Sequence, residues 1–563
     1  MTSTTLIFLP PELWQEIASY LTNRDFKSMR LAAKQFSSAV DLRFRRVFLS
    51  ANPLNIEVFR AVADHERFRH QVKEIIWDDA RLPRGSRKSR YLPGFGGPLV
   101  TDEDASDNET GLPSFQRPYG RWWPLEYICG EYEDTDENYE DEDDRDHYTQ
   151  LRKCSNFGKG VCPRWFKVGC AASVEDAYWR QKFDDGMAGL DREHPDYKSV
   201  KKLGSIGYPL TTCWQFYQYL IRQQEYVLAF RCDEEAFIHG LKQFPALTKM
   251  TVTSAAHGFL FNPLYQTPMI RSLPEGLYYP MPRGWPIPHS NQRFEVWSLP
   301  WKRLDERQKE QFHGFRIVTR ALAEQKNNVV EFSAESRLLR TGLNCTMLDD
   351  TCEEYHHLAT LLKKPGFRRL DLCFTLAGTW SSFPHKKLHD ILRGARDLQE
   401  LSFATTGYDM DEERKDLNVT PVPLKDMFPI ESWPKLQPFE LSRFIVRESD
   451  LISFLSELPV TVRSVKLSFL TFLDNGNHWH PFLEKLRKEI RETRLWSDRR
   501  RNVTVGFMQD RSLPGRARWI GKEVDEFLYG DGENPFRDPP IEHPKGGYGS
   551  LKDLLDPSRV FPG

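Results

Sequence analysis

Residues 355–372 read YHHLATLLKKPGFRRLDL and combine two different apolar spacings. Up to Gly366 its apolar residues follow a helical spacing. Phe367, Leu370 and Leu372 then follow the spacing h-x-x-h-x-h, in which h is an apolar residue. A period of two is typical of a strand with one buried face, whereas the preceding period is that of an amphipathic helix. The stretch therefore predicts a helix-then-strand unit.

The same spacing recurs along the chain, and in most copies a helical stretch precedes it. The middle apolar residues of the last four copies, at 370, 401, 439 and 465, are 31, 38 and 26 residues apart. Regular leucine-rich repeats have about 20–29 residues, so these units are irregular. Stacking them into a parallel-sheet solenoid would bury their apolar faces. The other copies are Val72/Ile75/Trp77, Leu247/Met250/Val252, Leu398/Leu401/Phe403, Leu436/Phe439/Leu441 and Val462/Val465/Leu467.

These strand motifs resemble irregular leucine-rich repeats, which implies a curved α/β array. The alternative is an ordinary α/β domain whose strands happen to follow helices. An insertion at residues 261–304, rich in Pro, Tyr and Trp, interrupts the array. We expect this insertion to be either a substrate-binding loop or a structure that caps the apolar side of the array.

Residues 6–40, LIFLPPELWQEIASYLTNRDFKSMRLAAKQFSSAV, predict two further helices. Pro10 and Pro11 suit a helix start, and Glu12 in the first turn complements the helix dipole. Asp25, after the polar break TNR, is predicted as the N-cap of the second helix. Apolar residues form one stripe on each helix: Leu13, Ile17, Tyr20 and Leu21 on the first, and Phe26, Met29, Ala33, Phe36 and Val40 on the second.

A third apolar segment follows, so that this region has two or three helices; its residues are Leu42, Phe44, Val47, Phe48 and Leu49. A domain of about 40 residues usually needs outside help to be stable. Apolar residues from Leu6 to Trp14 also precede any core that could cover them. This surface therefore either packs onto the rest of the chain or docks a partner.

The segment resembles an F-box, in the form common in fungal F-box proteins. The matching positions are Leu9, Pro10, Glu12, Leu13, Ile17, Leu21, Asp25, Phe26, Arg30, Lys34 and Phe36. They cover essentially the whole motif but less than a tenth of the chain. Trp14 is bulkier than the usual aliphatic residue, and Phe26 stands where Leu is commoner.

The resemblance implies a role and a set of partners. F-box motifs bind the Skp-type adaptor of cullin-based ubiquitin ligases, and the rest of the chain selects a protein substrate. By position, the residues that would contact the adaptor are Leu9, Pro10, Glu12, Leu13, Ile17 and Leu21. Burying aliphatic side chains contributes about 1.5–3 kcal/mol each before the costs of binding, so a few of them could sustain a specific interface.

Composition excludes several other classes. The net charge is −2 and the pI about 6.8, which favours neither nucleic acid nor an anionic membrane as partner. Mean hydropathy is −0.58, no stretch approaches a membrane span, and the N-terminus is not a secretory signal. Nine cysteines without a C-x-x-C pair predict a reduced, intracellular chain, with cytoplasm and nucleus left open.

Motifs for catalysis, nucleotides or metals are missing from the sequence. Cys154, Cys162 and Cys170 are eight residues apart, which is not a zinc-ligand spacing. Asp78-Asp79 is interpreted as the end of a strand rather than a catalytic pair. We therefore expect neither enzymatic activity nor a cofactor or metal.

These observations predict an α+β chain: a small all-α F-box followed by an irregular α/β leucine-rich-repeat-like solenoid with insertions. The expected divisions are an F-box domain at 1–50, a connecting region with the first helix-strand unit at 51–130, and an acidic disordered segment at 131–150. A recognition domain at 151–530 and a flexible tail at 531–563 follow. The predicted function is the substrate-recognition adaptor of a Skp–cullin–F-box ligase; the alternative is an F-box scaffold that acts outside a ligase.

Overall fold

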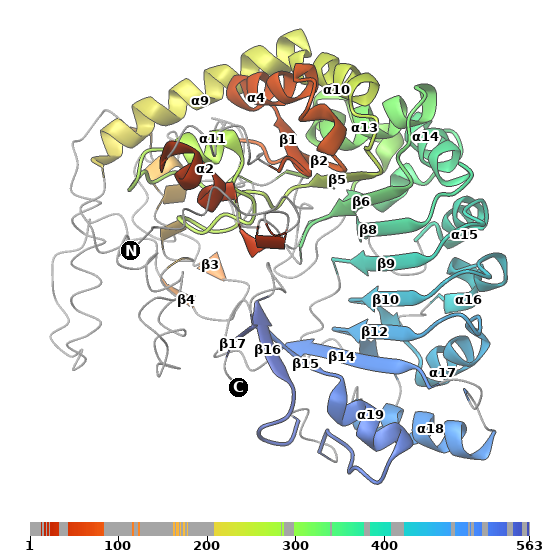
Figure 1. The fold of residues 1–563 in the computed structure, drawn as a ribbon. Helices are drawn as coiled ribbons and strands as arrows, with labels where there is room; N and C mark the ends of the chain where they lie inside the picture. The colour runs from red at the N-terminus through yellow and green to blue at the C-terminus, as the bar shows by residue number, and fades with distance from the viewer. Residues whose placement is uncertain are drawn as a thin grey trace, which may run out of the picture.

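A long, mostly parallel β-sheet forms the centre of the structure, a computed structural model (Figure 1). The structure describes parts of residues 13–32 and 162–177, and also residues 43–83, 115–116, 122–123, 208–282, 284–285, 298–337, 341–376, 383–406, 422–473, 479–493, 496, 500–508, 516–537, 544–553 and 560–561. The predicted acidic segment at 131–150 lies outside these residues.

Within the described ranges the sheet has thirteen strands, which follow one another in chain order. The strands from β1 to β14 are parallel, and the last three are added antiparallel. The strands are β1 (Arg46–Ser50), β2 (Glu74–Asp78), β5 (Lys249–Thr253), β6 (Glu331–Glu335), β8 (Arg369–Thr375), β9 (Glu400–Thr405), β10 (Pro438–Ser442), β12 (Ser464–Ser468), β14 (Asn502–Met508), β15 (Arg516–Ile520), β16 (Ser550–Asp553) and β17 (Val560–Phe561), with β7 (Leu343–Asn344) paired to β8.

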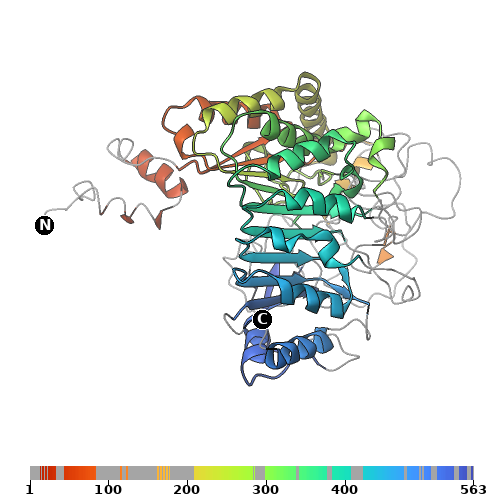
Figure 2. The same cartoon turned by 90° about the vertical axis from the view of Figure 1, so that its right-hand side faces the viewer.

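Helices connect successive parallel strands and cover one face of the sheet (Figures 1 and 2). These helices are α4 (Pro53–Asp64), α10 (Cys232–Gln243), α13 (His313–Glu324), α14 (Glu353–Leu362), α15 (His385–Arg393), α16 (Leu424–Met427), α17 (Glu448–Glu457) and α18 (Trp479–Glu492), and α19 (Lys522–Tyr529) packs beside α18. The other helices are α2 (Asn23–Ala32), α9 (Leu210–Phe230), α11 (Pro268–Ser272) and α12 (Glu306–Lys309). Two small sheets pair β11 (Ile445–Val446) with β13 (Thr471–Phe472), and β3 (Phe115–Gln116) with β4 (Trp122–Trp123).

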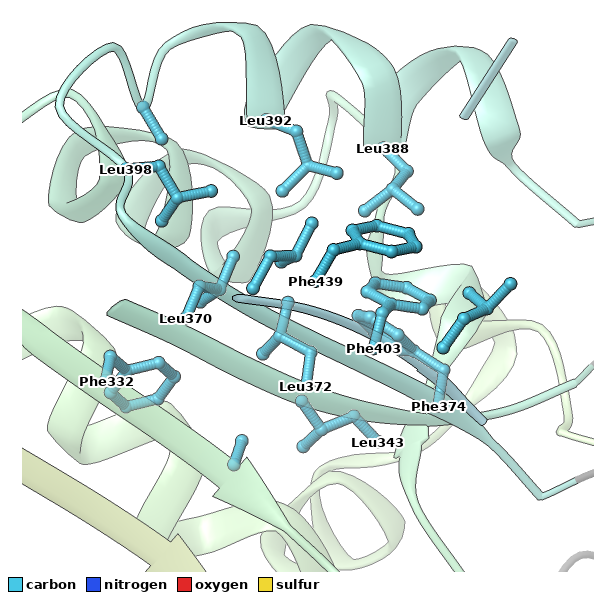
Figure 3. Packing of buried hydrophobic residues seen from close by; sticks show 14 of the residues in the cluster. Phe332, Leu343, Leu370, Leu372, Phe374, Leu388, Leu392, Leu398, Phe403 and Phe439 are labelled. Atoms are coloured by element: carbon cyan, nitrogen blue, oxygen red, sulfur yellow. The ribbon is translucent and has the colours of Figure 1, made fainter. Parts of the chain in front are cut away.

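The apolar spacing determines which residues enter the core. The register places Leu370 beside Leu401, and Leu401 beside Phe439, in one buried row under the helices. Two residues further along each strand, Leu372 and Phe403 belong to a second buried row. Figure 3 shows side chains of α15 packed over these rows. One continuous core therefore runs along the array from β1 to α19.

All six predicted h-x-x-h-x-h copies are buried strands, which confirms that part of the sequence analysis. The chain is a mixed α/β protein built on a large, mostly parallel sheet. One difference concerns residues 46–50, which belong to the third apolar segment of the predicted F-box region. They form β1 and pair with β2, because Val47 and Leu49 alternate toward the core. The sheet thus begins inside the range 1–50 expected for the F-box domain.

The described part of the insertion at 261–304 is packed against the body. Tyr278, Tyr279, Trp285 and Trp301 are all buried. Tyr278 and Tyr279 share an apolar cluster with α9, which lies beyond the first strands. The described residues therefore act as a covering structure, whereas residues 286–297 lie outside the described part.

The chain end also differs from the predicted flexible tail at 531–563. In its described residues, β16 pairs antiparallel with β15 and β17 antiparallel with β16, and Leu551 and Phe536 are buried. The Gly/Pro-rich composition suggested loose attachment, but alternate residues of residues 550–553 enter the core. Antiparallel strands thus cover the last parallel strand, β14, whose edge would otherwise present unpaired backbone groups.

Candidate functional site

The N-terminal helical segment leaves large apolar side chains exposed. Leu13, Ile17 and Tyr20 lie in helical conformation, followed by Leu21. Leu13 is 46% exposed and Tyr20 81%, whereas Ile17 and Leu21 are half-buried. Helical spacing puts Leu13 and Ile17 on one face. Three more predicted adaptor contacts, Leu9, Pro10 and Glu12, lie outside the described residues.

The second helix of this segment, α2, has one side chain fixed and another exposed. Phe26 is buried, and the Arg43 guanidinium lies 5.1 Å from the centre of its ring. Leu31 is 89% exposed. Asp25 was predicted as the N-cap but lies in the first turn, because the helix begins at Asn23. A carboxylate there still complements the helix dipole. In Figure 2, α2 lies to one side of the sheet.

A second candidate surface is the open face, defined here as the sheet face opposite the helices on strands β6 to β14. It carries alternate strand residues, which are half-buried: Glu331, Arg369, Asp371, Glu400, Ser402, Glu440 and Lys466. On the first strands this face is covered instead, since Tyr265 and Ala256 pack against Ile76. The open face is therefore polar and accessible only along the middle and end of the array.

Charged side chains on the open face pair across strands. Arg369 Nη1 lies 2.8 Å from Glu400 Oε2, and its Nε lies 3.1 Å from Asp371 Oδ2. Burial acts to lower the pKa of Arg369, but Asp371 and Glu400 raise it above its usual value. Lys466 pairs with Glu440 and lies 4.4 Å from the centre of the Trp519 ring. These contacts hold the charged side chains of neighbouring strands in fixed positions, with Lys466 against the buried Trp519 ring.

Charged side chains also pair across the first strands, β1, β2 and β5. Glu74 on β2 accepts from Arg46 on β1 at 2.8 Å and from Lys249 on β5 at 2.9 Å. Burial acts to raise the pKa of Glu74, but Lys249 and Arg46 together hold it below its ordinary value. Charges of alternating sign on neighbouring strands stabilise their register.

A buried polar network lies at the carboxyl end of β2. Asp79 Oδ2 accepts from Trp285 Nε1 at 3.0 Å, and Oδ1 accepts from the Gly314 backbone N–H at 2.9 Å and from Arg81 at 3.3 Å. Asp78 Oδ2 lies 3.7 Å from His257 Nε2. Burial raises the pKa values of both carboxyl groups, that of Asp78 to about 7. Apart from Arg81, these partners lie 179 to 235 residues from the two aspartates, so sequence alone did not reveal them.

The network extends to the start of α10. His313 Nε2 lies 2.9 Å from Asp233 Oδ2, and its Nδ1 lies 2.8 Å from Glu310 Oε2. Burial acts to lower the pKa of His313, but the two carboxylates raise it above its ordinary value. His257 Nδ1 lies 3.2 Å from the Tyr279 hydroxyl. Because His257, His313 and Tyr279 are buried, this network fastens the insertion and two helix starts to the sheet.

Comparisons with known sequences add no name: no protein-family model matches this chain, and no curated protein matches it. Among the described residues, no group of three or more His, Cys, Asp or Glu side chains is arranged to hold a metal ion. Nor does any helix in the described part have the length and apolar character needed to cross a bilayer. The exposed apolar helices and the open face thus carry the functional argument.

Proposed function

We propose that this chain is the substrate-recognition adaptor of a Skp–cullin–F-box ubiquitin ligase. The observation that carries the proposal is the exposure of Leu13, Tyr20 and Leu31 on the N-terminal helices. These three side chains are not part of the main apolar core, which runs continuously from β1 to α19. Exposed apolar side chains grouped on one module are typical of a docking surface.

The resemblance to an F-box supplies the partner, a Skp-type adaptor bound to a cullin. Leu13, Ile17 and Leu21 are the described residues that would contact it. The remaining chain, as an irregular leucine-rich-repeat-like solenoid, would hold a protein target on its open face. The ligase would then act by proximity, because binding raises the effective concentration of target lysines at the conjugating enzyme. This mechanism needs no catalytic group in the chain itself.

A binding assay with purified components tests the proposal. The full chain is immobilised and offered the Skp-type adaptor alone. A Leu13→Asp/Ile17→Asp variant places two charges in the apolar contact, so we expect adaptor binding at least a hundredfold weaker than that of the wild type. The control is Val460→Asp, which changes an exposed apolar residue distant in sequence and 76% exposed. Undiminished binding by the double variant would refute the proposed interface.

An extension of this binding assay distinguishes a ligase adaptor from an F-box scaffold that acts outside a ligase. Cullin and its RING partner are added to the adaptor complex, and their retention is measured by size-exclusion chromatography. Retention of both in one complex supports a ligase adaptor. Retention of the Skp-type adaptor without cullin would instead support an F-box scaffold that acts outside a ligase.

A further inference from the structure

Four arginines gather at the C-terminal end of the array, where α18 and α19 lie side by side (Figure 1). Arg487 and Arg491, one turn apart on α18, both donate through Nη2 to the Gly530 carbonyl, at 3.1 and 3.2 Å. The neighbouring residue, Tyr529, exchanges hydrogen bonds with the Arg501 backbone at 3.1 and 3.0 Å. The cluster therefore surrounds the last residue of α19, Tyr529, and the residue that follows it, Gly530.

Aromatic rings orient three of these guanidinium groups. Arg487 lies 4.5 Å from the centre of the Phe527 ring, and Arg500 lies 5.4 Å from that of Tyr529. Arg501 lies 5.0 Å from the centre of the Trp496 ring. Stacking on a ring face leaves the edge of a guanidinium, with its fork of donors, free to bind an oxyanion.

These arginines differ from those on the sheet, such as Arg369, which pairs with two carboxylates. In the residues that the structure describes, no carboxylate lies within ion-pair distance of any of the four. Gly530 and Leu458 supply carbonyl oxygens at the ends of α19 and α17, and a helix end carries only about half a charge. Within the described part of the chain, none of the four guanidinium groups therefore has a carboxylate as its direct counterion.

Arg501 is the most unusual member, because it is a buried cation that has no counterion among the described residues. Only 5% of the residue is exposed. Its Nη2 donates to the Leu458 and Pro459 carbonyls, at 2.9 and 3.2 Å, but its Nη1 is buried without a hydrogen-bond partner. Burial lowers the pKa of Arg501 to about 10. Since burial weakens screening, this charge adds to the field that an anion would meet at the surface.

We propose that Arg487, Arg491 and Arg500 bind a single oxyanion, a phosphate or carboxylate, carried by a segment of a partner protein, with Arg501 adding to the attraction. Two exposed acidic residues, Glu492 and Asp531, follow Arg491 and Gly530 in the chain. They would repel the continuous charge of a nucleic-acid backbone but leave room for one anionic group. The proposal stands independently of the adaptor function.

Inorganic phosphate is the first probe of this site, used with the full chain. Thermal unfolding is followed at constant ionic strength while phosphate replaces chloride. We expect a saturable rise in the unfolding temperature of the wild type. The Arg487→Gln/Arg491→Gln variant should bind phosphate at least tenfold more weakly. The control, Lys488→Gln/Lys522→Gln, removes two exposed charges from the same helices and should behave as the wild type. An equal loss in this control would overturn the proposal.

A second variant distinguishes a loss of phosphate binding from a loss of folding. Arg500→Gln keeps the carbonyl contacts of Arg487, Arg491 and Arg501, because among the described residues Arg500 contacts the Tyr529 ring and no carbonyl. It should weaken phosphate binding severalfold while leaving the unfolding temperature in chloride unchanged. An unchanged affinity for phosphate would contradict the assignment of Arg500 to the site.

The source of the oxyanion is distinguished with three versions of one arrayed peptide library, containing Ser, phosphoserine or Glu at a fixed position. Retention of phosphoserine peptides over Ser peptides assigns a phosphate group, and retention of Glu peptides assigns a carboxylate. In both cases binding must fall in the Arg487→Gln/Arg491→Gln variant. Arginine-dependent binding of duplex DNA or anionic vesicles without peptide binding would refute a protein partner.

Discussion

Asp78 makes a testable contribution to the pH dependence of stability. It is the last residue of β2, and only 1% of it is exposed. Its Oδ1 accepts from the Ala80 backbone N–H at 3.1 Å. Burial raises its pKa from 3.8 to about 7, and the adjacent Asp79 charge acts in the same direction. The carboxyl group is therefore favoured in its neutral form when the protein is folded.

The shift has a defined sign and size. Because the folded pKa is higher, the folded state binds the proton more tightly than the unfolded state does. The resulting stability is fully present below about pH 4 and is lost as pH rises to about 7. A pKa difference of roughly three between the folded and unfolded states corresponds to about 4 kcal/mol. This value is an upper bound, because the surroundings of a buried carboxyl group can adjust when it ionises. This is a large part of the 5–15 kcal/mol typical of a folded protein.

Asp78→Asn keeps the Oδ1 acceptor but cannot ionise. Compared with the wild type, the variant should be about equally stable at pH 4 and up to about 4 kcal/mol more stable at pH 8. Urea unfolding of both proteins at intervals from pH 4 to 8 measures the difference. The raised pKa of His313 gives a slope of the same sign in both proteins, and this slope cancels in the comparison.

Asp349→Asn is the matched control. Hydrogen bonding to Lys302 holds the pKa of Asp349 at about 2, so its stabilising effect is lost only as pH falls through that value. Its difference from the wild type should therefore be constant between pH 5 and 8. If Asp78→Asn is less stable than the wild type at pH 8, or if its difference does not depend on pH, the burial argument is wrong.

Two further substitutions test the packing, with urea unfolding as the measurement. Leu401→Ala in the buried row should cost about 2–5 kcal/mol, and Val460→Ala on the surface close to none; equal effects would contradict the assigned core. Gly314→Ala in α13 should cost about 1–3 kcal/mol, although alanine usually favours a helix. The Cβ of an alanine at position 314 would lie 2.4 Å from Trp77 Nε1. In the control, Gly546→Ala, the added Cβ meets no atom within 4 Å, so this change should be neutral. A stabilising Gly314→Ala would refute the predicted clash with Trp77.

The strands could be predicted where large apolar residues occupied all three positions of the spacing. β6 escaped because Ala334 fills the third position, although the core accepts it. β14 escaped because Arg500 stands at the first position, outside the strand. β1 does follow the spacing, through Phe44, Val47 and Leu49, but the sequence analysis described it only as a third apolar segment and left a third helix open. A short strand and a buried helix segment cannot be separated by local periodicity alone.

The buried polar network at the end of β2 and the arginine cluster both depend on contacts that local sequence does not encode. Asp78-Asp79 was correctly placed at a strand end, yet its partners come from the insertion and from α13. In the sequence, Arg491, Arg500 and Arg501 lie in one basic stretch, whose pattern does not show which of them is buried. Its unusual property, a buried guanidinium without a carboxylate, arises only when α17, α18 and α19 come together.

The array also sets the geometry that the proposed function requires. Neighbouring strands lie about 4.8 Å apart, so the nine parallel strands from β1 to β14 span about 40 Å. The N-terminal helices enter at β1, and a target on the open face near β9 would lie about 25 Å from that edge. Adaptor and target would then occupy separate surfaces, one on the N-terminal helices and the other on the open face of the sheet. Substitutions at Leu13 and at Lys466 should consequently act independently: the first weakens adaptor binding, the second target binding, and neither changes the other by more than about 0.5 kcal/mol.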